Sequence, residues 1–412
     1  MCYVLAMFGA FAAFVPLGAL ILPQKIATIP GMAFGGAVQA LSWILVAGGV
    51  AAGLGNIVAG VISDALFRRT RSRRLVIGIA TIAVAAGLAA LAVARSFEEI
   101  VLAILAFQLA LNLMLSPLVA LMVDYVPDRQ KGQMAGWLGL ALPFGSLMVT
   151  LLVIVASWFR GTAQTAPLMI MIMIIIVLAL VAPLVVIWPV PPLIPPGSAG
   201  EATAPDDPSD GGRALTSPVF WDFLLAWTAR LLVQFAAAAI LPYLYFFVAD
   251  VVRPMGGARA IGAAVGILAF AFAVMSIVGG LGAGWISDRF GRRRAPLAIG
   301  AIIVAASMAL LSAAPGWPLT VVAYGSFAAG LAGFLAIDSA LVAQLVAANT
   351  RRATLLGVMN LTNTLPGIIV PVLTLVILGD RSGAMPMVAV LQLAAVGALV
   401  AALCCTQIRT LR

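Results

Sequence analysis

Two charged residues lie inside apolar stretches of this 412-residue chain, where a charge needs a chemical reason. Arg230 lies roughly 18 Å along a helix that starts at Pro218, and Asp338 lies roughly 12 Å before Val346, at 1.5 Å per residue. A charge at membrane depth costs at least about 2.5 kcal/mol, so each requires a partner or a water-filled cavity. Either Asp338 binds and releases a proton while Arg230 adjusts its proton affinity or contacts a solute, or the two form a purely structural ion pair.

The absence of histidine narrows the candidates for a proton carrier, because no imidazole is available to titrate near neutral pH. A proton that is carried through the protein must therefore bind to a carboxylate. Sodium is the alternative ion, since a lone carboxylate serves either.

Amide and hydroxyl side chains also interrupt the apolar stretches at helical spacing. They are Gln108, Asn112, Ser116, Gln234, Asn360 and Asn363. Gln234 follows Arg230 by one turn and shares its helix face, which predicts a contact with a solute hydroxyl. For the others, cavity lining and interhelical hydrogen bonding are equally good interpretations.

Composition identifies the class of protein that must position these groups. The chain is 64% hydrophobic and 9% charged, against about 25% charged in soluble domains. The apolar runs are long and do not alternate, which predicts an all-α integral membrane protein rather than a barrel. The three cysteines form no disulfide or metal pattern, and no nucleophile constellation or phosphate-binding loop is present, so we expect no metal, no cofactor and no enzyme.

Twelve apolar runs are long enough to cross a bilayer. They are Tyr3–Leu22, Val38–Leu66, Leu75–Ala94, Ile100–Val123, Met134–Trp158, Leu168–Trp188, Phe220–Val248, Ile261–Ile286, Leu297–Ala314, Leu319–Val346, Leu355–Leu378 and Met387–Leu403. Residues 190–217, rich in Pro, Gly, Ser and Asp, form a predicted linker between a six-helix bundle at 1–189 and another at 218–412. The first run is too long for a signal peptide and is expected to be a span.

A tandem duplication relates the two bundles. Gly60, Asp64, Arg68 and Arg69 recur 224 residues later as Gly284, Asp288, Arg292 and Arg293. The tripeptide Ile21-Leu22-Pro23 likewise recurs as Ile240-Leu241-Pro242.

Basic residues set the predicted orientation. Sixteen fall in one set of loops and six in the opposite set, with Arg230 completing the 23. The positive-inside rule places the first set and both termini in the cytoplasm, and the protein in the plasma (inner) membrane. This placement explains the net charge of +9 better than nucleic-acid binding, for which no reader motif is present.

The duplicated stretch resembles the signature of the major facilitator superfamily. Gly284, Asp288, Arg289, Gly291, Arg292 and Arg293 match it in full, whereas Ala65 and Phe67 depart from it in the first copy. The resemblance implies twelve spans in two pseudo-symmetric halves and a cytoplasmic gate, in which Asp64 approaches a helix starting near Ala353 and Asp288 one starting near Gln133. Arginines that only fix the topology are the alternative.

Four shorter segments look like the sugar:cation symporter branch that includes glycoside-pentoside-hexuronide and sucrose-type transporters. They are Leu22–Gln24, Asp124–Gly132, Ile337–Leu341 and Gly357–Asn360. This likeness implies a monomer that carries a small solute, a sugar or glycoside, with a proton or sodium. Proton-driven efflux of amphipathic compounds is the second alternative, although the Gly-Pro pattern of many drug antiporters is absent from Leu140–Ser146. A solute receptor that does not transport is the third.

Overall fold

The computed structural model describes eleven stretches of the chain. They are residues 1–29, 34–70, 72–126, 128–158, 165–187, 218–254, 257–290, 293–313, 316–347, 352–378 and 385–408. All regular structure in these stretches is helical. The chain divides into two compact units, Met1–Glu201 and Ala202–Arg412, and the predicted linker lies outside the described residues.

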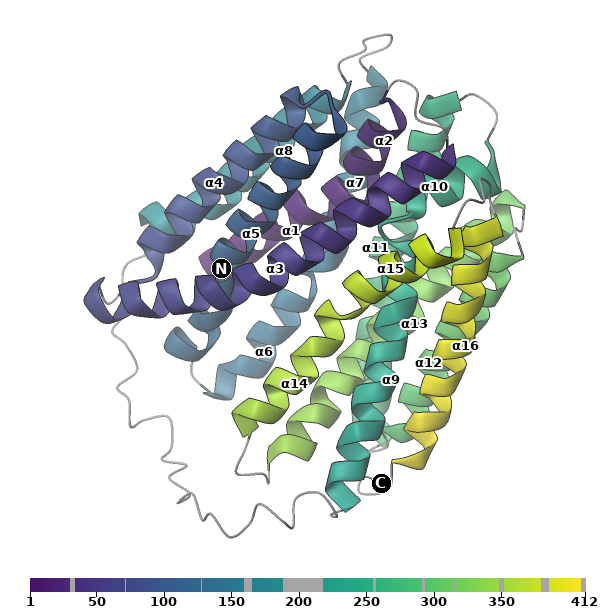
Figure 1. The fold of residues 1–412 in the computed structure, drawn as a ribbon. Coiled ribbons are helices and arrows are strands. Elements are labelled where there is room, and N and C mark those ends of the chain that lie inside the picture. The colour runs from purple at the N-terminus through teal and green to yellow at the C-terminus, as the bar shows by residue number, and fades with distance from the viewer. Residues whose placement is uncertain are drawn as a thin grey trace. The chain divides into compact units, whose positions relative to one another are not determined.

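Unit 1 contains the helices of the first half (Figure 1). They are α1 Cys2–Pro16, α2 Leu22–Ala27, α3 Phe34–Thr70, α4 Arg74–Val93, α5 Phe97–Tyr125, α6 Asp128–Gly139, α7 Ala141–Trp158 and α8 Thr165–Ala182, with π-helical turns η1 at Leu17–Ile21 and η2 at Pro183–Ile187.

Unit 2 contains the helices of the second half. They are α9 Pro218–Ile240, α10 Leu244–Phe247, α11 Gly257–Phe290, α12 Arg294–Ser312, α13 Trp317–Ala347, α14 Arg352–Thr364, α15 Pro366–Leu378 and α16 Met385–Gln407, with a π-helical turn η4 at Val248–Val252.

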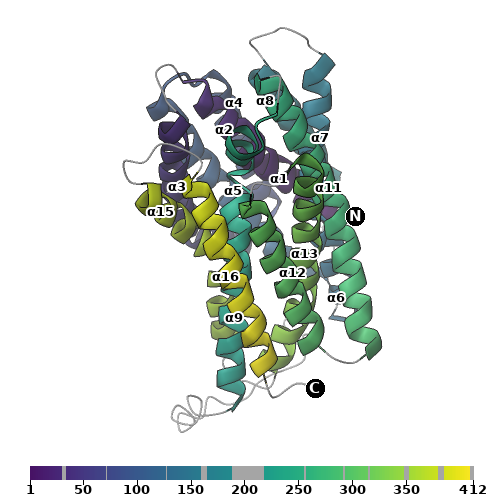
Figure 2. The same cartoon turned by 90° about the vertical axis from the view of Figure 1, so that its right-hand side faces the viewer.

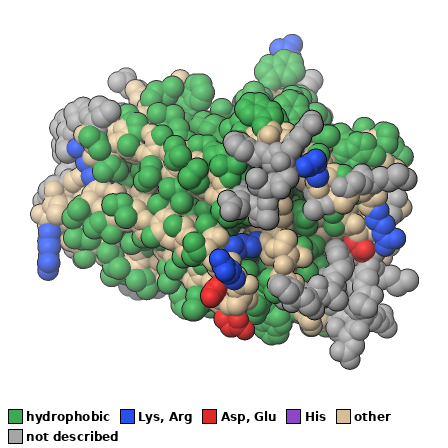
Figure 3. All heavy atoms as spheres, turned by 90° about the horizontal axis from the view of Figure 1, so that it is seen from above, with side chains coloured by type: hydrophobic (Ala, Val, Ile, Leu, Met, Phe, Trp, Pro, Cys, Tyr) green, Lys and Arg blue, Asp and Glu red, His purple; other side chains and the backbone are tan. Residues whose placement is uncertain are grey.

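Among the described residues, eleven helical segments are long and apolar enough to span a membrane. A twelfth span is counted if the bent pair Val358–Thr364 and Pro366–Ile377 forms one crossing. Large apolar side chains such as Ile57, Leu281 and Val376 are exposed, and Figure 3 shows hydrophobic side chains over much of the face it presents. Such extended apolar surface is typical of contact with lipid, and the prediction of an all-α membrane fold is confirmed.

Corresponding helices pack in the same pairs inside each unit (Figures 1 and 2). In unit 1, α5 packs on α3 and α4, and α8 packs on α1 and α4. In unit 2, α13 packs on α11 and α12, and α16 packs on α9 and α12. A duplicated bundle produces this correspondence, because each copy buries the same apolar faces.

Small residues bring α13 close to its neighbours. A Cβ added to Gly279 of α11 would lie 2.5 Å from the Cα of Ala329 in α13, and one added to Gly330 would lie 2.9 Å from the Cγ2 of Ile303 in α12. Real Cβ atoms do not approach other atoms so closely. The glycines therefore allow these helices to approach α13, which carries Asp338, more closely than larger side chains would.

Prolines divide the spans. The C-terminal end predicted for the run Phe220–Val248 is wrong. The helix α9 stops at Ile240, and a turn at Leu241–Tyr243 precedes α10. Pro242 lies in that turn and has no N–H to continue the helical hydrogen bonds. Pro366 lies after the break between α14 and α15, whose axes differ by 42°.

Candidate functional site

The two charges in the apolar interior of unit 2 are partners of each other. Arg230 of α9 donates from Nη1 to Oδ2 of Asp338 in α13 at 2.9 Å. The Asp338 side chain is 1% exposed and that of Arg230 is 18% exposed. A carboxylate buried so completely depends on this guanidinium, because removing one partner leaves an uncompensated charge.

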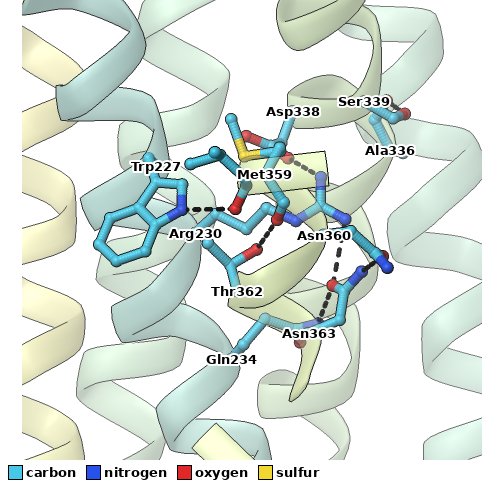
Figure 4. A network of polar contacts seen from close by, with 11 residues as sticks. Trp227, Arg230, Gln234, Ala336, Asp338, Ser339, Met359, Asn360, Thr362 and Asn363 are labelled. Carbon is cyan, nitrogen blue, oxygen red and sulfur yellow. Dashed lines mark hydrogen bonds and ion pairs between the residues drawn. The ribbon is translucent and has the colours of Figure 1, made fainter. Parts of the chain in front are cut away.

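A third helix joins the pair through amide side chains (Figure 4). The second guanidinium nitrogen of Arg230, Nη2, donates to Oδ1 of Asn363 in α14 at 3.2 Å. The same oxygen accepts from Nε2 of Gln234 at 3.0 Å, and Nδ2 of Asn363 donates to Oδ1 of Asn360 at 2.9 Å. Four residues predicted from the sequence therefore form one network with Asp338.

One face of α9 presents this network to α14. Trp227, Arg230 and Gln234 are three and four residues apart, and the indole Nε1 of Trp227 donates to the carbonyl oxygen of Val358 at 2.8 Å. Sequence reasoning missed Trp227, although its position one turn before Arg230 was a usable signal. The three side chains tie α9 to α14 on the N-terminal side of the bend at Pro366.

The polar contact between α3 and α5 of unit 1 is neutral. Asn112 of α5 is buried and accepts at Oδ1 from Nδ2 of Asn56 in α3 at 3.3 Å, while its own Nδ2 donates to the carbonyl oxygen of Gln108 at 2.8 Å. A Cβ added to Gly48 of α3 would lie 3.6 Å from the Gln108 side chain, so Gln108 also borders α3. Asn56 was not predicted from the sequence, although a single amide within an apolar span indicates a polar contact between helices.

In the first copy of the signature, a neighbouring arginine pairs with the aspartate. Asp64 Oδ1 lies 3.0 Å from Nη1 of Arg73, which also donates to Ser63 and lies 4.6 Å from the centroid of the Phe67 ring. Arg69 is exposed. Since Phe67 departs from the signature, its ring gives the local guanidinium a cation–π contact.

The second copy is described only in part. The side chains of Arg68 and Asp288 and the whole of Gly291 and Arg292 lie outside the described residues. Arg289 lies over the Trp285 ring at 5.7 Å, and Arg293 is the residue before the first turn of α12. A Cβ added to Gly60 would lie 3.6 Å from the Ser116 oxygen, whereas one added to Gly284 would meet no atom within 4 Å. On α11 the close approach of a neighbouring helix is at Gly279 and not at Gly284. The predicted gate remains a prediction.

The residues that the structure describes contain no group of three or more His, Cys, Asp or Glu side chains able to hold a metal ion. The site in unit 2 contains one carboxylate, one guanidinium and three amides. These groups can exchange a proton and form hydrogen bonds with a polar solute.

A bundle of about twelve apolar spans with an ion pair and amides in its interior defines the class of polytopic membrane transporters. The sequence matches the model of the Major Facilitator Superfamily over residues 1–280 and 257–409. The chain belongs to the major facilitator superfamily and, as predicted, is a transporter rather than an enzyme. No curated protein matches the sequence.

Solved structures of this superfamily have the same fold. A D-xylose–proton symporter is 15% identical with a TM-score of 0.74, covering 100% of this chain and 99% of that one. The xylose transporter XylE from E. coli, in an inward open conformation, is 16% identical with a TM-score of 0.72, covering 100% and 96%. A D323A mutant of the nucleoside transporter NupG is 14% identical with a TM-score of 0.67, covering 99% and 100%. At these identities the likeness concerns the fold alone.

Proposed function

We propose that this protein is a secondary active transporter that moves a small polar solute, a sugar or glycoside, together with a proton by alternating access. The observation that carries the proposal is the buried Asp338 carboxylate, held by Arg230 beside the exposed amides of Asn360 and Asn363. A proton-binding group next to hydrogen-bonding groups is the minimum that coupled uptake requires.

Asp338 is the proton carrier in this proposal. When it is ionised, Arg230 neutralises it through a charge-assisted hydrogen bond. When Asp338 binds a proton, that bond weakens and Arg230 becomes available to other acceptors. The two charge states therefore favour different arrangements around α9, α13 and α14, and a ligand that binds one state better shifts the conformational equilibrium.

The signature residues act on the same equilibrium from the cytoplasmic ends of α3 and α11. A carboxylate at a helix C-terminus is unfavourable beside the negative end of the helix dipole and requires compensation. Arg73 supplies part of it to Asp64 within unit 1, and in this proposal a helix N-terminus of the other half supplies a further part to Asp64 and Asp288 when the cytoplasmic side is closed. Asp288→Asn is expected to enrich the inward-open state. Cysteine labelling from the cytoplasmic side measures this; unchanged accessibility relative to the parent would exclude the gating role and leave the arginines as topology signals.

Solute counterflow in proteoliposomes tests the proposed function. The purified chain is reconstituted with unlabelled sugar inside, and entry of labelled xylose, glucose or disaccharide is followed at pH 5.5 and 7.5. We expect counterflow of at least one sugar, and net accumulation only when an inward proton gradient is imposed. Accumulation driven by an outward proton gradient would support the efflux alternative, and binding without any counterflow would support a receptor.

A further inference from the structure

The hydrogen-bond direction of the network in unit 2 is determined by Arg230, because a guanidinium only donates. The Asn363 atom that faces Arg230 must be the oxygen, and it accepts from Gln234 as well. The Asn363 nitrogen must then face the oxygen of Asn360, as observed at 2.9 Å. Asn360 is thereby oriented with its nitrogen away from the network (Figure 4).

The unmet hydrogen-bonding capacity of this network consists mainly of donors. Asn360 is exposed, and its nitrogen donates to no residue that the structure describes. Arg230 uses one hydrogen on each terminal nitrogen, and its Nε has no partner. The Gln234 oxygen is the unmet acceptor on the same helix face, since its nitrogen is the atom that donates to Asn363. A solute group with lone pairs and no hydrogens, flanked by a hydroxyl, matches this set.

Charge balance favours a carboxylate as the solute group. Asp338 and Arg230 neutralise each other in the structure. Once Asp338 carries a proton, the guanidinium is a lone positive charge inside a span, which is unfavourable unless another anion compensates it. A solute carboxylate supplies that anion and fits the two-donor geometry of a guanidinium.

We infer that the site takes a hydroxylated carboxylate solute, whose carboxylate is held by Arg230 and Asn360 when Asp338 is protonated. This inference rests on the proposed function and names its substrate class. The proton forms an O–H bond on the Asp338 carboxylate, and the solute brings one negative charge. One proton and one carboxylate then cross together with no net charge.

The charged group that acts on Asp338 comes from a neighbouring helix. Arg230 of α9 donates a hydrogen bond to the carboxylate. Among the described side chains of α11, α12 and α14, which also pack in this unit, no titratable group interacts with Asp338. The pH dependence of solute binding is therefore assigned to Asp338.

The test compares D-gluconate with its neutral analogue D-glucitol, using the full chain in proteoliposomes and detergent. At pH 5.5 we expect gluconate to bind at least about tenfold more tightly than glucitol, since hydrogen bonds between charged groups are stronger than those between neutral ones. We also expect gluconate entry to be unaffected by a membrane potential. Equal binding of the two probes at pH 5.5, or gluconate uptake that responds to the potential, overturns the inference.

Two variants localise the effect. Asn360→Asp replaces the outward donor with an acceptor of the same shape and is expected to abolish the preference for gluconate, while Asn360→Ala reduces it. Arg253→Gln, which removes an exposed arginine that contacts only Asp250, is the matched control and should keep the preference. An Asn360→Asp variant that elutes as a folded protein and still prefers gluconate contradicts the assigned contact.

The same experiment separates the two proposals. If glucose shows proton-driven uptake and gluconate does not bind, the substrate class is wrong and the proposed function stands. If folded protein gives counterflow of neither sugars nor gluconate, the proposed function itself fails.

Discussion

The two units share a pattern of helix packing and differ in the polar groups inside it. In unit 1 the interior contact is a neutral amide pair, Asn56 and Asn112. In unit 2 it is the ion pair of Arg230 and Asp338, extended by Asn363. Neutral amides hold helices together at little electrostatic cost, whereas a buried charge pair changes with proton binding. The two bundles of this chain keep the same pairs of packed helices, and the described polar contact between helices is neutral in one and charged in the other.

Arg230→Gln is expected to have the largest effect on stability and uptake, because it leaves Asp338 buried without a counter-charge. Losing one partner of a buried pair destabilises by about 3–5 kcal/mol. The melting temperature in detergent should fall and uptake should cease. The double variant Arg230→Gln/Asp338→Asn should regain stability and not proton-driven uptake; a single variant as stable as the parent would contradict the dependence of Asp338 on Arg230.

Gly279→Leu should have the next largest effect, because its side chain would enter the space occupied by Ala329. Overpacking of this kind costs about 1–3 kcal/mol. Gly284→Leu is the control on the same helix, since an added Cβ there meets no atom within 4 Å. Thermal stability in detergent distinguishes them, and an equal loss for both would refute the assigned α11–α13 contact.

Asn112→Leu is expected to have the smallest effect of the three variants. Interhelical hydrogen bonds in membranes contribute about 0.6 kcal/mol, so stability should change little. Proton dependence of uptake should be retained, because the variant removes no titratable group. Measuring uptake against pH checks this; a shifted pH profile would give unit 1 a part in coupling that the comparison denies it.

The sequence analysis succeeded where the signal was local. Long apolar runs predicted the spans, and the cost of a charge at membrane depth identified Arg230 and Asp338 as residues that need partners. It failed where the answer depended on contacts between helices. The end of α9 was missed because a run containing Pro242 remains apolar beyond the turn. Asn56 was missed because its contact with Asn112 crosses from α3 to α5.

The orientation of the amides shows the same limit. Asn360 and Asn363 were recognisable as polar positions on one helix. Their donor and acceptor directions follow only from the guanidinium on another helix, whose rotation relative to α14 no spacing in the sequence specifies.

The central claim is that Asp338 carries the coupling proton, and uptake by Asp338→Asn in proteoliposomes tests it most directly. The asparagine keeps the shape of the side chain and can still accept from Arg230, while it cannot bind a proton. We predict that solute exchange between the two sides persists and that accumulation driven by a proton gradient is lost. Accumulation at the parental level would contradict the account.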